Sequence, residues 1–126
     1  MWRGRFPITS FVLLVLSKKA ASGITSLSRE ERLLFTSCEF WAATAARDLA
    51  TYLGSEAGER LRDAHEAFSA LGAARTARAL KLANRGVRDP AHVPWGQEQV
   101  SNLEDRLLSS EDAIDQLIAQ YALKLI

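Results

Sequence analysis

The 126-residue chain has little of what most metal and disulfide sites need. It contains one cysteine, Cys38, and two histidines, His65 and His92. A single cysteine excludes an internal disulfide and a multi-cysteine metal cluster, and two histidines argue against a histidine-rich metal site. A strong excess of either charge is also missing, because sixteen basic and fifteen acidic residues leave a net charge of +1. This balance argues against a strongly basic nucleic-acid packaging protein and against a strongly acidic decoy.

Long hydrophobic runs are absent as well. The apolar run over residues 11–16 is too short to span a bilayer and lies at the lower limit for an export signal. Lys18 and Lys19 follow this run, at a place where export signals are normally uncharged. We therefore expect a buried first helix, no membrane association and a cytoplasmic protein.

The composition that remains is that of a globular protein, with 48% hydrophobic and 25% charged residues. The length favours one domain over residues 1–126. Apolar residues recur at helical spacing along most of the chain, and strand-like alternation is nearly absent. The sequence therefore predicts an all-α, single-domain antiparallel bundle of about five to six helices.

Caps and glycines set the expected helix limits. Ser28 and Glu31 form a capping box, from which one apolar stripe continues without interruption to Gly54. Gly72 and Gly86 are predicted to end two further helices. Pro90, Pro94 and the neighbouring glycine exclude a helix over residues 88–96. The helices are thus expected to cover residues 7–19, 28–53, 55–71, 74–84, 98–108 and 110–125.

A row of basic residues marks the fourth expected helix. They recur every three or four positions, with no acidic residue among them: Arg75, Arg78, Lys81, Arg85 and Arg88. The simpler interpretation is a solvated face opposite Ala77, Leu80 and Ala83. The functional interpretation is a surface that faces phosphate, nucleic acid or an acidic partner. Nucleic acid is the less favoured partner, because such proteins usually have a clearly basic domain or an identifiable reading motif.

Acidic residues gather after this row. Residues 97–126 hold six acidic and two basic residues, whereas residues 1–96 hold nine acidic and fourteen basic residues. The acidic region could neutralise the basic helix within the fold, or it could form a second docking surface of opposite charge. The sequence leaves both arrangements open.

Other candidate residues carry weaker signals. Trp95, between Pro94 and Gly96, either closes the edge of the core or contacts a partner, and we include it with the five basic residues in the candidate binding surface. Cys38 falls on an apolar stripe and is expected to pack as a small hydrophobic residue. No phosphate-loop, dinucleotide or zinc motif is present, so we expect no cofactor, no metal and no enzymatic activity. An enzyme that uses His65 or His92 is kept as a third hypothesis.

The order of several segments resembles a known family. A capped Leu-Ser-Arg-Glu-Glu-Arg start at residues 27–32 precedes an Ala-His-Glu-Ala-Phe-Ser-Ala-Leu-Gly-Ala segment at 64–73, and Leu-Glu-Asp-Arg-Leu follows at 103–107. Over roughly residues 8–126 this is similar to the DNA mimic protein 19-like family (domain of unknown function 4375). The resemblance implies a small all-α scaffold that binds another protein, with no catalytic residues to carry over. The acidic DNA mimicry of the family name is not carried over, because this chain is nearly neutral.

One departure from the family pattern concerns the long second helix. The family breaks it with an Asn-Gly-Gly turn, whereas residues 46–49 here are Ala-Arg-Asp-Leu. Because alanine and arginine resist positive φ, we expect the helix to continue. The leading hypothesis is a bacterial, non-enzymatic protein-interaction module, with an inhibitory or immunity-like role as one form of it. The alternative is anion or nucleic-acid binding through the basic helix.

Overall fold

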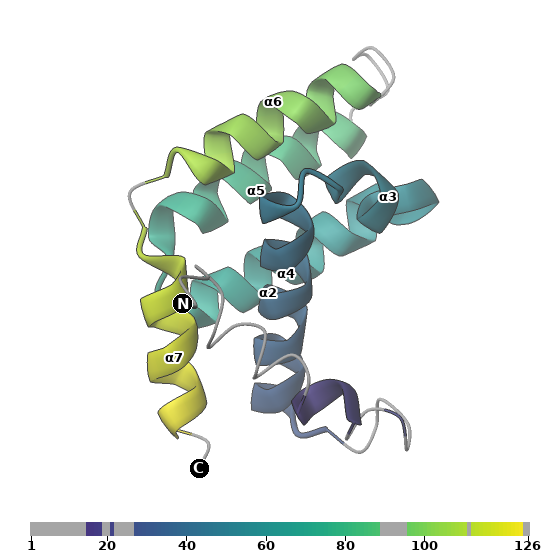
Figure 1. The fold of residues 1–126 in the computed structure, drawn as a ribbon. Helices are drawn as coiled ribbons and strands as arrows, with labels where there is room; N and C mark the ends of the chain where they lie inside the picture. The colour runs from purple at the N-terminus through teal and green to yellow at the C-terminus, as the bar shows by residue number, and fades with distance from the viewer. Residues whose placement is uncertain (1–14, 19–20, 22–26, 89–95, 111, 125–126) are drawn as a thin grey trace, which may run out of the picture.

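The computed structural model describes residues 15–18, 21, 27–88, 96–110 and 112–124 (Figure 1). Within these ranges the regular structure is helical and includes no strand. The all-α class predicted from the sequence is therefore confirmed. The α-helices are α2 (Arg29–Ala45), α3 (Leu49–Leu53), α4 (Ala57–Leu71), α5 (Ala74–Arg88), α6 (Gln97–Leu108) and α7 (Ile114–Lys124).

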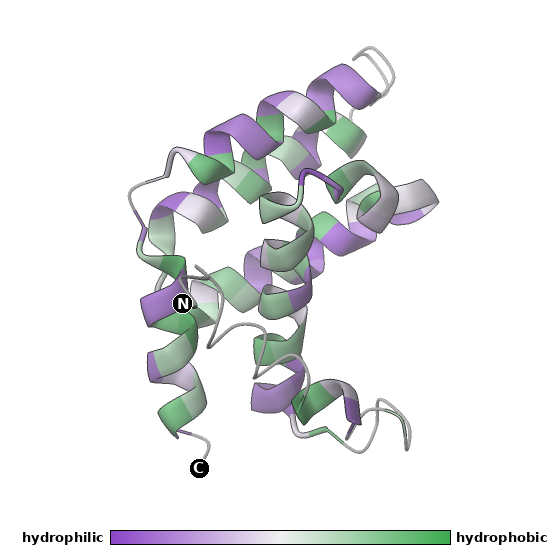
Figure 2. Ribbon diagram, in the orientation of Figure 1, coloured by the Kyte–Doolittle hydropathy of each residue, from purple (hydrophilic) through white to green (hydrophobic). Residues whose placement is uncertain are grey.

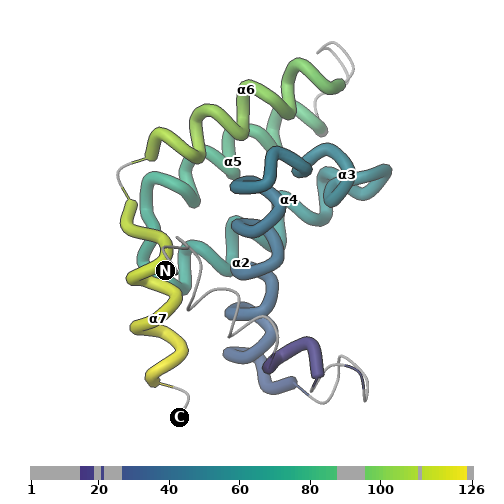
Figure 3. Tube along the Cα trace, in the orientation of Figure 1, coloured from purple at the N-terminus to yellow at the C-terminus, as the bar shows by residue number. Residues whose placement is uncertain are grey.

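The α4–α5 pair forms the centre of the bundle. A tight turn at Gly72 joins the two helices, and they pack along their length. Helix α2 crosses α4, α6 lies beside α5 and touches α2 and α3, and α7 packs against α2 and α4 (Figures 1 and 3). A 3-10 turn over Gly54–Glu56 connects α3 to α4.

The helices are amphipathic, and their apolar stripes alternate with polar faces along each ribbon (Figure 2). Three aromatic rings tie α2, α3 and α4 together. Phe40 lies edge-on to Tyr52 at a centroid distance of 5.8 Å and to Phe68 at 5.9 Å. Both phenylalanines are fully buried. Burial of these stripes is the main force that assembles the bundle.

The predicted capping box begins α2. The Ser28 hydroxyl accepts a hydrogen bond from the Glu31 N–H at 3.1 Å, and the Glu31 carboxylate accepts one from the Ser28 N–H at 2.9 Å. Residues 15–18 form a helical turn, in which Leu16 is buried and Val15 is half-exposed. The other residues of the expected first helix lie outside the described part of the chain.

The prediction that the second helix continues to Gly54 is wrong. Helix α2 ends at Ala45, and Arg47 takes a left-handed conformation with φ of 59°. The N–H of Asp48 bonds the Ala43 carbonyl at 2.9 Å, and the N–H of Arg47 bonds the Thr44 carbonyl at 3.1 Å. This is the hydrogen-bond pattern of a Schellman motif, which usually places glycine where Arg47 stands. The chain therefore turns at this point without a glycine.

Other expected limits also shift. Helix α5 does not stop at Gly86 but continues to Arg88. An internal glycine costs only about 1 kcal/mol relative to alanine, and Val87 beyond it packs against the core, which favours continuation. Helix α4 begins at Ala57 instead of Ser55, because the 3-10 turn comes first. Helix α7 begins at Ile114, a few residues after the expected serine cap.

Candidate functional site

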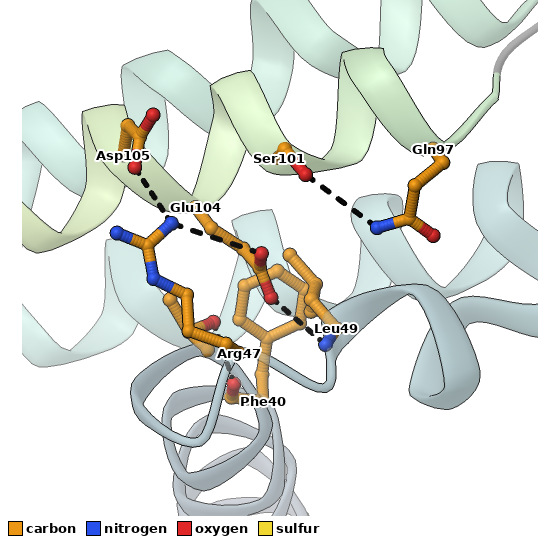
Figure 4. Close-up of polar contacts among 8 residues, drawn as sticks. Phe40, Arg47, Leu49, Gln97, Ser101, Glu104 and Asp105 are labelled. Atoms are coloured by element: carbon orange, nitrogen blue, oxygen red, sulfur yellow. Dashed lines mark hydrogen bonds and ion pairs between the residues drawn. The ribbon is translucent and has the colours of Figure 1, made fainter.

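The turn that contains Arg47 is held by two carboxylates of α6 (Figure 4). Glu104, only 3% exposed, accepts a hydrogen bond from the Leu49 N–H at 3.0 Å. Its other carboxylate oxygen lies 3.9 Å from Arg47 Nη1, which also pairs with Asp105 at 2.6 Å. Left-handed arginine is strained by about 1–2 kcal/mol, and these contacts with the Schellman bonds offset that strain. They also fix α6 against the α2–α3 turn.

The start of α5 is anchored from the α6–α7 connection. Asp112 accepts a hydrogen bond from the Thr76 N–H at 2.8 Å, and the Thr76 hydroxyl lies 3.4 Å from the Ser110 hydroxyl. Thr76 itself is fully buried. The carboxylate satisfies an N–H that the first turn of a helix leaves without an intrahelical partner.

These contacts show where part of the acidic C-terminal region is used. Glu104 and Asp105 hold the Arg47 turn, and Asp112 holds the first turn of α5. In the described ranges no ion pair involves Arg78, Lys81 or Arg85. Glu104, Asp105 and Asp112 therefore form no ion pair with Arg78, Lys81 or Arg85 on the outward face of α5.

The predicted basic residues do share one face of α5. Arg75, Arg78, Lys81 and Arg85 are exposed, whereas Leu80 on the opposite side is fully buried. Arg88 is the last residue of the helix, but its side chain lies outside the described residues, as does Trp95. The structure therefore brings together four of the six residues that the sequence assigned to a binding surface.

A groove with apolar and basic side chains in its walls runs beside these cations, between α5 and α6. Two adjoining hollows, with volumes of about 270 and 300 Å³, share Ala79, Leu82 and Arg106 in their walls. Leu82 is 46% exposed, which is unusual for a large apolar side chain in this bundle. Among the described residues that line either hollow, none is acidic. We call this feature the α5–α6 groove.

Two members of this groove, Arg106 and Leu82, were not predicted from the sequence. Arg106 belongs to an otherwise acidic region, and Leu82 stands between basic residues on α5. Only the packing of α6 beside α5 brings Arg106 toward Arg75 and Arg78. A helical wheel of α5 would have shown Leu82 on the polar face, and this was the one available signal.

The hollow beside His65 brings this histidine no partner for general acid–base chemistry. His65 lines a shallow hollow between α4 and α5 together with Ser69, Arg78 and Lys81. The lining of that hollow, as far as the chain is described, includes no carboxylate. A general acid–base site needs a second group within hydrogen-bond reach. His92 lies outside the described residues.

Three titratable groups meet where α2, α3 and α4 join. The Arg60 guanidinium lies over the Tyr52 ring, 4.8 Å from its centroid. Burial raises the pKa of Glu39, and the positive charge of Arg60 opposes this shift. Burial also raises the pKa of Tyr52, with a further contribution from the Glu39 charge. No pocket opens onto this cluster among the hollows described above, so it is a packing feature of the helix junction.

Cys38 is buried as the sequence predicted, with an exposed fraction of 0%. Burial raises the pKa of its thiol from 9.0 to about 12, and the charges of Asp115 and Glu39 add to the shift. A reactive cysteine needs a lowered pKa and access to solvent, so this thiol is inert in the folded chain.

The Cys38 thiol is expected to make stability fall with alkaline pH. The unfolded chain ionises the thiol near pH 9, whereas the folded chain holds its proton up to about pH 12, so raising the pH between these values favours unfolding. We expect the free energy of unfolding of the wild type to fall by about 1–2 kcal/mol more than that of Cys38→Ala between pH 9 and 10.5. Urea unfolding of both proteins at each pH measures this.

Cys38→Ala is the suitable comparison because Tyr52, whose pKa is also raised, remains in both proteins. Parallel loss of stability in the two proteins would contradict the assignment to the thiol.

The described residues form neither a metal-ligand cluster nor a membrane-spanning helix. No group of three or more His, Cys, Asp or Glu side chains there is arranged to hold a metal ion. None of the helices in the described ranges combines the length and apolarity needed to cross a bilayer.

Comparison with known proteins adds one finding. The family model described as DMP19-like protein matches residues 25–125. The match begins later than the roughly residue 8 expected from the sequence. No curated protein and no solved structure matches the chain.

Proposed function

The chain belongs to the DMP19-like family, whose model covers residues 25–125, and on this basis we propose that it is a non-enzymatic module that acts by binding another protein. The docking surface is the exposed face of α5 together with the α5–α6 groove. One observation carries the proposal. Exposed Arg78 and Arg85 flank a half-exposed Leu82 beside a groove whose described lining has no acidic residue.

This combination of side chains suits a protein interface better than a solvated face. Arginine is enriched among the side chains that dominate binding energy at protein interfaces, and Arg78 and Arg85 are both exposed. A face that only keeps a helix soluble usually mixes both charges, whereas the exposed charged residues described on α5 are all basic. An inhibitory or immunity-like role fits such a surface.

DNA mimicry is not part of the proposal. It would require many unpaired carboxylates at phosphate-like spacing. This chain has a net charge of +1, and three of its C-terminal carboxylates bind within the fold. A DNA-binding protein would meet cations on α5 instead of a substitute for DNA.

Site-specific photo-cross-linking in the source cells tests the proposal. A photoreactive amino acid at Leu82 is expected to give one cross-linked protein, because this side chain is central to the surface. The same group at the exposed Gln120 on α7 is the control and is expected to give none. Identical product patterns from both positions, or no product from Leu82, would overturn the proposed docking surface.

Anion or nucleic-acid binding is the second candidate, favoured by the shared face of Arg75, Arg78, Lys81 and Arg85. It predicts that a single-stranded oligonucleotide binds at low salt and that its affinity falls steeply as salt is added. Fluorescence anisotropy at about 50 and 200 mM salt measures this dependence. Absence of binding at low salt, or binding that Arg75→Ala with Arg78→Ala leaves unchanged, would remove this candidate.

A further inference from the structure

Building on the proposed function, we propose that the α5–α6 groove receives an acidic amphipathic helix of the partner protein. Carboxylates of that helix pair with Arg78, Arg85 and Arg106, and an apolar side chain between them covers Leu82. Family membership alone does not give the chemistry of the partner.

The groove follows the length of α5 and α6. Its walls pair Arg75 and Arg78 with Ser110 at one end, and Ala83 with Gln99 at the other. The two walls therefore run antiparallel. Ala79 and Ala83 line the wall that α5 contributes, and their short side chains allow a partner helix to approach closely.

The cations lie on both sides of the apolar centre. Arg78 and Arg106 come from opposite walls of one hollow, and Arg85 lies two helical turns beyond Arg78 on the exposed face. At 1.5 Å per residue, Arg78 and Arg85 are separated by about 10.5 Å along the helix axis. Carboxylates seven residues apart on a partner helix have the same separation, so charge complementarity sets both the sign and the spacing of the partner's residues.

Leu82 decides between an acidic helix and a nucleic acid. It lies between Arg78 and Arg85 along the helix, is 46% exposed, and is removed from water only if the partner contributes an apolar group. A phosphate backbone would pair with the arginines but would leave Leu82 uncovered. The near-neutral charge of the whole chain also gives little of the long-range attraction that nucleic-acid binding uses.

Titration of the isotope-labelled full chain with a synthetic peptide tests the inference. The probe is an amphipathic helical peptide with glutamates seven residues apart and leucine between them. The first control is a scrambled peptide of the same composition. In two-dimensional amide NMR spectra, the amphipathic peptide is expected to shift residues of α5 and α6, and to bind at least about fivefold more tightly than the scrambled peptide.

Matched variants assign the contacts. Arg78→Ala with Arg85→Ala is expected to weaken peptide binding about tenfold, because two charge-assisted contacts are lost. Leu82→Ala is expected to weaken it about threefold. Lys124→Ala removes an exposed cation of α7 and is expected to leave binding unchanged. Preserved amide spectra of each variant show that it is folded.

Several outcomes would overturn the inference. These are equal binding of both peptides, shifts confined to other helices, and an oligonucleotide that displaces the peptide while Leu82→Ala has no effect. Shifts in α5 and α6 that depend on protein concentration without peptide would identify a second copy of the chain as the occupant, which also overturns it. If cross-linking at Leu82 captures a protein but the peptide does not bind, the proposed function stands and only the acidic-helix inference fails.

Discussion

Replacement of Phe40 by alanine is expected to lower the free energy of unfolding by about 3–5 kcal/mol. The ring is fully buried and contacts Tyr52 and Phe68 edge-on. Its removal leaves a cavity where α2, α3 and α4 meet, and it ends two aromatic contacts at once. Because small domains are stable by only about 5–15 kcal/mol, the loss is a large fraction of the total. Urea unfolding followed by circular dichroism measures it.

Phe35 provides the matched control for Phe40. It lies on the same helix but is only partly buried against the core. Phe35→Ala is therefore expected to cost clearly less than Phe40→Ala, because less of the ring is removed from water in the native state. Equal losses for the two variants would mean that the aromatic junction does not hold the bundle together.

Glu104→Ala is expected to cost about 2–4 kcal/mol, a large effect for a residue on a largely polar helix. The change removes the acceptor for the buried Leu49 N–H and leaves the strained Arg47 turn with one carboxylate partner. An unpaired buried N–H cannot regain its bond from water. The same denaturant unfolding measures the loss, and amide exchange is expected to be fastest in α3.

Three variants separate the causes of this effect. Glu104→Gln keeps an oxygen acceptor for Leu49 and is expected to lose less than half as much. Asp105→Ala removes an exposed partner of Arg47, where ion pairs contribute at most about 1 kcal/mol. Arg47→Gly relieves the left-handed strain while it removes the ion pairs, so its net effect is expected to be near zero. If Asp105→Ala were as destabilising as Glu104→Ala, the hydrogen bond to Leu49 would not be the main contribution.

The contrast between two helix ends shows where sequence reasoning succeeds. Gly72 ends α4 with φ of 85°, and the N–H of Ala73 bonds the Phe68 carbonyl at 2.9 Å. The end of α2 has the same pattern of bonds, with Arg47 in the equivalent place. A glycine in the sequence predicts such a turn, because it has no Cβ to clash in the left-handed conformation. Arginine gives no such signal.

The break at Arg47 is decided by residues far away in the chain. Glu104 and Asp105 lie more than fifty positions later, and they reach the turn only because α6 packs against α2 and α3. The sequence predicted a continuous helix because alanine and arginine resist the positive φ that such a turn requires. The long-range hydrogen bond and ion pairs outweigh it in the folded chain.

The candidate surface also combines a part that the sequence predicted with a part that only the structure shows. Spacing along the chain placed Arg75, Arg78, Lys81 and Arg85 on one face, because a single helix needs no tertiary information to align them. The groove beside them, with Arg106 in its wall, exists only once α6 lies along α5.

What the sequence by itself determined is the all-α class, most of the helices and the side of each that avoids water, since a period of 3.6 residues records both. It determined the cap at Ser28 and the turn at Gly72 for the same reason, because those signals are complete within a few residues. Only the tertiary structure decided the turn at Arg47, the use of Glu104, Asp105 and Asp112 within the fold, and the groove on α5. Each of these features depends on side chains that come together only when the helices pack. The distances between helices cannot be predicted from the spacing of residues within one helix.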